Sequence, residues 1–313
     1  MARRELGPAA LRVARAVAAV LPAGEVVIGC SGGADSTALA LGAAWAAPRC
    51  DARPLCVVVD HGLQEGSGAV ADAVGARLAE RGIAVEVVTV QVERRPGESL
   101  EDRARVARLE ALAARGASVL LGHTLDDQAE TVLLGLLRGS GTRSLAGMAT
   151  VRGPFVRPLL GLRRADTVAA CREWGIAVWD DPHNHDDAFA RVRARQLLAS
   201  LSGTLGRDVA PALARTAALA RTDADFLDDL AARAGVEVVR GPHLPVDDVA
   251  ALPEALRLRV LRDWLAAHGV AGTSSAHLCA VDALLGRWRG QGPVAIPGAR
   301  VARIDSVLRL LPA

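Results

Sequence analysis

The sequence predicts an α/β protein with a doubly wound parallel sheet of the Rossmann-like type, followed by a smaller, mainly helical C-terminal domain. Short apolar runs that are typical of buried strands alternate with helical stretches in the first half of the chain, as in a parallel sheet. After about Leu201 the pattern becomes helical and rich in Ala and Leu. The 313 residues also exceed the ~250 that one core usually supports. We therefore expect two domains, over residues 1–205 and 206–313.

Each expected element follows from its local pattern. Strands are expected at Glu25–Cys30, Leu55–Val59, Val85–Val92 and Ser118–Leu121. Helices are expected at Leu11–Leu21, Thr37–Ala47, Ala69–Arg81, Leu100–Arg115 and Ala165–Trp174. Near the end of the chain, the stretch from Gly292 to Leu311 has the turn residues and alternation of a small hairpin.

The composition excludes several kinds of chemistry. All 37 basic residues are Arg, so a Walker A lysine, a Schiff-base lysine and a lysine nucleophile are impossible. Aromatic residues make up only 3% of the chain and Tyr is absent, so contacts to RNA would depend on Arg. The net charge of +2 argues against a strongly basic protein but allows local patches.

The cysteines and apolar runs indicate a cytoplasmic protein. Five Cys form no CxxC pair, and the N-terminal residues do not resemble a signal peptide. The longest apolar runs are interrupted by Arg, so no membrane contact is expected. The oligomeric state is left open, with a homodimer as one candidate.

The strongest functional signal is the segment Ser31–Thr37, with the sequence SGGADST, between an expected strand and an expected helix. Gly32 and Gly33 allow the backbone to turn tightly and approach an anion, while the helix N-terminus and nearby hydroxyls donate hydrogen bonds. Asp35 beside a phosphate requires a divalent cation, so we interpret it as a Mg²⁺ ligand. The alternative is a plain glycine turn in which Ser36 caps the helix.

The SGGxDS string resembles the PP-loop of enzymes that split ATP into AMP and pyrophosphate. That resemblance covers GMP, NAD and argininosuccinate synthetases and several tRNA-modifying enzymes, so the loop does not select a substrate. Further segments do, and they are Val59–Leu63, Gly122–Thr131, Leu137–Gly141, Asp181–Asn184 and Phe189–Arg195. In this order and spacing they resemble the tRNA(Ile)-lysidine synthetase family over about the first 200 residues.

The resemblance implies an activity and its substrates. ATP with Mg²⁺ would adenylate O2 of the wobble cytidine in an isoleucine tRNA with a CAU anticodon. Free L-lysine would then attack C2 and expel AMP, which forms lysidine. The C-terminal domain would hold the tRNA mainly through phosphates.

The resemblance also implies roles for individual residues. ATP would bind Ser31, Gly32, Gly33, Ala34, Asp35, Ser36, Asp60 and His61. Asp127 and Glu130 would bind lysine, and Arg105 would stabilise the α-phosphate as pyrophosphate leaves. His123 would lie near ATP and the base, so that Asp35, Arg105, His123 and Asp127 form the catalytic set. The tRNA would contact Arg191, Arg193 and Arg195.

Each of these residues also has a structural interpretation. Asp127 and Glu130 fit an Asp-x-x-Glu capping box, and His123 fits a core histidine. Arg105 and Arg108, three apart, fit solvated arginines paired with Glu101 and its neighbours.

The remaining candidates have plain interpretations as well. Asp60 and His61 could end a strand and begin a turn. The three arginines after Ala190 could be solvated surface; they would share a face if extended and spread out if helical. The chain departs from the family pattern at Val192, Ala194 and His183, which weakens a base-reading role for position 192.

Three other functions were weighed. A PP-loop tRNA thiolase would need sulfur chemistry, for which paired cysteines are absent from the sequence. An amidotransferase-like synthetase would need an ammonia source, and the sequence contains no N-terminal nucleophilic Cys or glutaminase segment. An RNA-binding module with a relict loop conflicts with the intact PP-loop residues.

Overall fold

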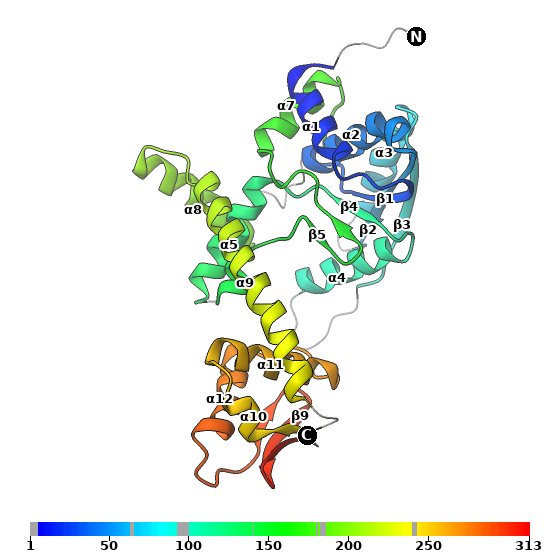
Figure 1. Ribbon diagram of the computed structural model, residues 1–313. Helices are drawn as coiled ribbons and strands as arrows, with labels where there is room; N and C mark the ends of the chain where they lie inside the picture. Colours follow the sequence, from blue (N-terminus) through cyan, green and yellow to red (C-terminus); the bar gives the residue numbers. More distant parts are fainter. Residues whose placement is uncertain are drawn as a thin grey trace. The chain divides into compact units, whose positions relative to one another are not determined.

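The computed structural model describes residues 6–62, 66–92, 100–139, 141–179, 181, 186–239 and 243–313. The chain divides into two units, Met1–Ala218 and Leu219–Ala313 (Figure 1). The first unit is an α/β fold with a mainly parallel sheet, and the second combines helices with a small antiparallel sheet. The predicted fold class is confirmed.

The first unit alternates strands and helices. Its strands are β1 (Gly24–Cys30), β2 (Ala52–Asp60), β3 (Ala84–Thr89), β4 (Val119–Leu121), β5 (Val151–Arg152) and β6 (Phe155–Val156). Its helices are α1 (Pro8–Ala18), α2 (Ala34–Cys50), α3 (Ser67–Ala79), α4 (Leu100–Ala113), α5 (Leu125–Leu137), α6 (Thr142–Leu145), α7 (Arg164–Glu173) and α8 (Ala190–Leu205), and α9 (Ala210–Val238) continues into the second unit. Each strand and helix expected in this region is present.

The sheet order places a switch point beside the predicted nucleotide loop. The order is β3-β2-β1-β4-β6-β5, with β5 antiparallel to β6 and the other pairs parallel. The chain moves outward from β1 to β3 and then returns to add β4 on the other side of β1. Ligands of doubly wound sheets bind at such a reversal, outside the carboxyl ends of the strands. The loops after β1 and β4 therefore lie where a ligand is expected.

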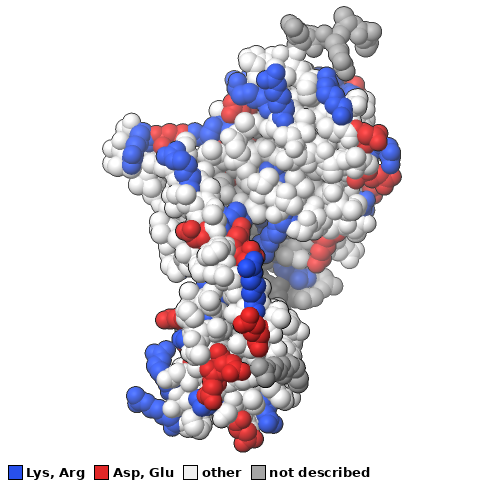
Figure 2. Space-filling view, viewed as in Figure 1, with Lys and Arg blue, Asp and Glu red and all other residues white. Residues whose placement is uncertain are grey.

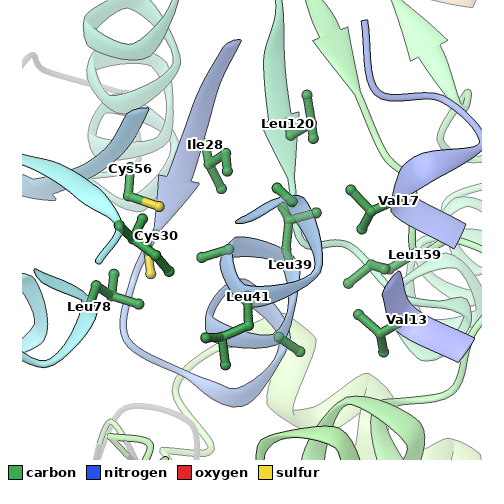
Figure 3. Packing of buried hydrophobic residues seen from close by; sticks show 14 of the residues in the cluster. Val13, Val17, Ile28, Cys30, Leu39, Leu41, Cys56, Leu78, Leu120 and Leu159 are labelled. Atoms are coloured by element: carbon green, nitrogen blue, oxygen red, sulfur yellow. The ribbon is translucent and has the colours of Figure 1, made fainter. Parts of the chain in front are cut away.

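Alternation along β1 builds a core on both faces of the sheet. Val26, Ile28 and Cys30 face the side covered by α1, α2 and α7, where they join Leu39 in the large cluster shown in Figure 3. Val27 faces the opposite side and packs with residues of α4 and β4. Because both faces are covered, β1 is a nearly continuous apolar run. This burial fixes the position of the loop that follows Cys30.

The second unit has its own core. Its elements are β7 (Leu244–Pro245), α10 (Val246–Ala250), α11 (Glu254–Ala267), α12 (Ser275–Gly286), β8 (Val294–Ile296), β9 (Ala299–Ile304) and β10 (Val307–Pro312). The sheet order is β7-β10-β9-β8. Asp305 and Ser306 both have positive φ, as a two-residue hairpin turn between β9 and β10 requires. The predicted C-terminal hairpin is confirmed and belongs to a four-stranded sheet.

The surface shows no large area of one charge on the face in Figure 2, where arginines and acidic residues are interspersed. Within the described ranges, every helix is too short or too polar to cross a membrane.

Candidate active site

The loop after β1 has the geometry of an anion cradle. Gly32 has φ +84, and a Cβ at this position would lie 2.4 Å from Cγ2 of Val74. Only glycine suits both conditions. Gly33 is the N-cap of α2, with extended backbone and no side-chain hydrogen bond to the helix. The N–H groups of the first turn are therefore directed toward an incoming anion.

Ser36 organises the loop instead of capping the helix. Its hydroxyl accepts from the backbone N–H of Ser31 at 3.1 Å and donates to the carbonyl of Gly33 at 3.1 Å. The hydroxyls of Ser31 and Ser36 are 3.2 Å apart. The alternative in which Ser36 is the N-cap is wrong, because Gly33 occupies that position and Ser36 lies inside the first turn.

Asp35 lies in the first turn of α2 and reaches toward α7. Its Oδ2 accepts from Nε of Arg164 at 3.3 Å, and its Oδ1 accepts a short hydrogen bond from the hydroxyl of Thr167. Burial raises the pKa of Asp35, and the nearby Asp127 adds to that rise, while Thr167 and Arg164 oppose it. Because burial and Asp127 disfavour the ionised form of Asp35, a cation bound beside it would stabilise the carboxylate.

Asp127 and Glu130 lie at the start of α5, but only one of them is part of a cap. Thr124 is the N-cap, and Asp127 at the third position accepts from the backbone N–H of Thr124 at 2.7 Å. The capping box is therefore Thr124 with Asp127. Glu130 lies one turn further along, so the Asp-x-x-Glu box is wrong.

Glu130 is almost fully buried, with a side chain 2% exposed. Its Oε1 accepts from Arg164 at 3.2 Å and from Nε of Arg195 at 3.0 Å. Its Oε2 is buried and lacks a hydrogen-bond partner in the described part of the chain. Burying a carboxylate oxygen without a hydrogen-bond partner is costly in free energy, unless a ligand donates a hydrogen bond to it.

Two arginines that sequence analysis did not select complete this group. Arg164, the first residue of α7, donates from Nη2 to Oδ1 of Asp127 at 2.7 Å and also bonds Asp35 and Glu130. Arg163 forms a two-pronged ion pair with Asp126, whose Oδ2 also accepts from the backbone N–H of Arg164 at 2.7 Å. The only sequence signal was an Arg-Arg pair before an expected helix.

His123 follows β4 and lies close enough to Asp127 for the two charges to interact. The pKa of His123 is lowered to about 3, mainly by burial. The charges of Arg157, Arg105 and Arg191 also lower it, while the negative charge of Asp127 raises it. Its Nδ1 is buried and has no hydrogen-bond partner within the described residues. The imidazole is therefore neutral at physiological pH and has a ring nitrogen available for a hydrogen bond to a ligand.

Arginines of α4 and α8 form a cationic group next to the two histidines. Burial, together with the positive charges of Arg105 and Arg191, lowers the pKa of Arg108 to about 10. Burial and Arg108 also lower the pKa of His61. Like charges held together in this way favour an anion such as a phosphate.

Asp60 ends β2 and begins a turn, as its structural interpretation predicted. Its Oδ1 accepts from the backbone N–H of Gly62 at 2.9 Å. Hydrogen bonds from Ser67 and Gly62 lower the pKa of Asp60, so it is ionised at neutral pH. The structure places Asp60 at the carboxyl edge of the sheet, beside His61.

The three arginines of α8 have separate environments because the segment is helical. Arg195 bonds Glu130, and Arg193 donates to the carbonyl groups of Asp187 and Ala188 at 2.6 and 2.8 Å. Arg191 belongs to the cationic group with Arg105 and Arg108. Between them Val192 and Ala194 are buried, which explains the apolar residues at these positions. The departure at His183 lies outside the described residues.

The fold and this site define the class first: an α/β enzyme of the PP-loop type, which uses ATP. Residues 9–201 match the family described as PP-loop domain, and residues 244–306 match the one described as TilS substrate binding domain. The chain belongs to the tRNA(Ile)-lysidine synthase family.

Named relatives support that membership over most of the chain. The tRNA(Ile)-lysidine synthase of Leifsonia xyli subsp. xyli is 47% identical over 303 residues, which covers 93% of this chain and 91% of the relative. That of Mycolicibacterium paratuberculosis is 50% identical over 289 residues, covering 90% and 88%. The matches cover most of this chain and most of each relative, so this chain corresponds to each of the two relatives over nearly the whole length.

A solved structure shares the fold alone. The U34-tRNA thiolase NcsA from Methanococcus maripaludis, solved with its [4Fe-4S] cluster, superposes with a TM-score of 0.55 at 16% identity. The match covers 67% of this chain and 78% of that one. The identity to the thiolase is low, whereas the tRNA(Ile)-lysidine synthases are 47–50% identical to this chain. The thiolase alternative is therefore not favoured.

Proposed function

We propose that this enzyme forms lysidine by joining free L-lysine to C2 of the wobble cytidine in a CAU-anticodon isoleucine tRNA, with ATP as the activating substrate. The observation that carries the proposal is the adjacency of two sites. Arg164 bonds both Asp35, in the nucleotide loop, and the pair Asp127 and Glu130 on α5. An activating site and an amine site must adjoin for one base to be adenylated and then aminated in place.

The nucleotide would lie on the loop after β1. The N–H groups of the first turn of α2 would receive its phosphates, with Ser31 and Ser36 holding the loop in shape. Arg105 would stabilise the charge that develops on the α-phosphate as pyrophosphate leaves. Asp60 and His61 would face the adenine and ribose.

The residues present fit a magnesium ion. Mg²⁺ is usually held by one or two carboxylates together with phosphate oxygens, and Asp35 offers a carboxylate beside the phosphate cradle. When bound, the ion would neutralise charge on the triphosphate. Arg164 and Thr167 contact the same carboxylate.

The amine would enter at Asp127 and Glu130. The buried carboxylate of Glu130, one of whose oxygens lacks a partner in the described part of the chain, and the partly buried carboxylate of Asp127 suit the ammonium group of lysine. The neutral imidazole of His123, next to Asp127, would orient the substrates by hydrogen bonding through its buried Nδ1. The proton that the amine loses as it attacks C2 would pass to solvent, because an imidazole with a pKa of about 3 is too weak a base to hold it. Expulsion of AMP then completes the substitution.

The tRNA would present its wobble base unstacked, because a stacked base cannot reach such a pocket. Arg191, Arg193 and Arg195 would contact its backbone near the anticodon, and the second unit would hold it elsewhere. With these substrates the reaction would take place in the cytoplasm.

A direct assay tests the proposal. The protein is incubated with labelled lysine, ATP, Mg²⁺ and unmodified isoleucine tRNA bearing a CAU anticodon, and the digested tRNA is analysed by mass spectrometry. We expect label in one modified cytidine and one pyrophosphate per lysine incorporated. Incorporation of sulfur with no lysine would support the thiolase, and pyrophosphate release without tRNA would support a small-molecule synthetase.

A further inference from the structure

Arg164 is the common partner of three carboxylates that come from two helices. Its Nε lies 3.3 Å from Oδ2 of Asp35, its Nη2 2.7 Å from Oδ1 of Asp127, and its Nη1 3.2 Å from Oε1 of Glu130. All three guanidinium nitrogens are therefore engaged. One side chain holds together the proposed nucleotide site and the proposed lysine site.

The backbone of Arg164 is fixed, but its side chain has room to move. Its backbone N–H is held by Asp126, which Arg163 holds in turn. The side chain is 27% exposed and lines a cavity of about 170 Å³. The cavity is also lined by Glu130, Arg163 and Arg195. Rotation of the side chain into this cavity would move the guanidinium and leave the backbone of α7 in place.

The present arrangement leaves an acceptor of the site unsatisfied. Asp127 uses Oδ2 for the cap of α5 and Oδ1 for Arg164. Glu130 uses Oε1 for two arginines, while Oε2 is buried without a partner in the described part of the chain. An ammonium group that entered between Asp127 and Glu130 would satisfy that oxygen, but it would share its space and its acceptors with Arg164.

We propose that Arg164 is a positioning residue that competes with the lysine ammonium group for Asp127 and Glu130 and links that site to the nucleotide loop. This inference rests on the proposed function. The guanidinium of Arg164 would be repelled by a cation held at Asp35 and attracted by the phosphates, and so drawn away from α5. Lysine would then compete less with Arg164 for Asp127 and Glu130, so it would bind more tightly once the nucleotide is in place.

The linkage is reciprocal and has a measurable size. If nucleotide raises the affinity for lysine, lysine must raise the affinity for nucleotide by the same factor. Couplings of this kind are typically about 5- to 150-fold. The order of binding that results would keep lysine out until the cytidine can be activated.

The test is calorimetric titration of lysine into the full-length protein, without nucleotide and with Mg²⁺ plus the α,β-methylene analogue of ATP. We expect the Kd for lysine to fall at least about fivefold in the wild type when the analogue is present. Arg164→Gln should bind lysine with one Kd in both conditions. Arg172→Gln, an exposed arginine on the same helix, should keep the wild-type factor.

A second variant keeps the test decisive if Arg164→Gln does not fold. Arg164→Lys retains the charge, but its compact ammonium cannot bridge three carboxylates. Its coupling factor should be smaller than that of the wild type. A wild-type factor in either folded variant overturns the inference, as does an equal weakening of lysine binding in both conditions, which would indicate a purely structural role.

The same titration separates this inference from the proposed function. If the wild type binds lysine equally with and without the analogue, the lysine site stands and the linkage through Arg164 is wrong. If the wild type binds no lysine in either condition, the proposed lysine site is wrong and the inference falls with it.

Discussion

Asp127 and Arg164 are joined by an ion pair of 2.7 Å between Oδ1 and Nη2, the shortest contact that Arg164 makes with the three carboxylates around it. Burial raises the pKa of Asp127, but Arg164 and the hydrogen bonds from Thr124 outweigh it and lower the pKa overall. Asp127 is therefore ionised at neutral pH. One of its oxygens pairs with Arg164 and the other caps α5. The ion pair therefore connects the start of α5, where lysine is proposed to bind, to the arginine that also contacts Asp35 in the nucleotide loop.

Asp35→Asn should abolish tRNA-dependent release of pyrophosphate from ATP. The amide keeps the shape of the side chain but loses the charge that would hold a cation on the phosphates, and such electrostatic contributions are worth about 10²- to 10³-fold in rate. A pyrophosphate-release assay measures the effect. Asp72→Asn, an exposed acid on α3, should behave as wild type. Unchanged turnover in Asp35→Asn would remove Asp35 from the mechanism.

Glu130→Gln should raise the KM for lysine by about 10- to 150-fold, the equivalent of one charge-assisted hydrogen bond. Pyrophosphate release should stay within about threefold of wild type, because nucleotide binding depends on other residues. The isosteric amide can still accept from Arg195. If the variant instead melts earlier and its KM for lysine is unchanged, Glu130 is a structural residue only.

Gly32→Ala should reduce the free energy of unfolding by about 2–4 kcal/mol, since an alanine at φ +84 is strained and its Cβ overlaps Val74. Urea denaturation measures the change. Gly161→Ala is the control, because a Cβ there meets nothing within 4 Å and its backbone has no positive φ. Equal stability of the two variants would contradict the tight turn seen after β1.

The pH dependence of stability should contain a contribution from His123. Its pKa is lowered to about 3 in the folded state from an ordinary value of 6.5, so the unfolded chain binds the extra proton between these values. Stability from this group is complete above about pH 6.5 and falls as the pH decreases toward 3, by at most about 1.4 kcal/mol per pH unit.

Urea denaturation of His123→Asn at pH 7 and pH 5 isolates that contribution. The variant should lose less stability between the two pH values than the wild type does. His243→Gln, at an exposed position, should follow the wild type. An identical pH dependence in all three proteins would show that His123 is not buried in neutral form.

The sequence by itself determined the sheet, the nucleotide loop and the family. These features depend on short-range patterns: apolar runs for β1 and its neighbours, and glycines at the positions where the turn after β1 requires them. Asp127 and Glu130 lie at the start of a helix as predicted, whereas Asp35, expected in the loop before a helix, lies in the first turn of α2. The family resemblance of the surrounding motifs selected the roles of these residues.

Only the tertiary structure decided how these residues are partnered. Arg164 lies 34 residues from Glu130 and 129 from Asp35 along the chain, so no local pattern could reveal that it bonds both. The cap of α5 likewise needed backbone geometry to identify Thr124. The arginines of α8 separated because the segment is a helix, in which neighbours two apart face different sides. Ion pairing between distant elements depends on how the helices pack, which the linear order of charges does not encode.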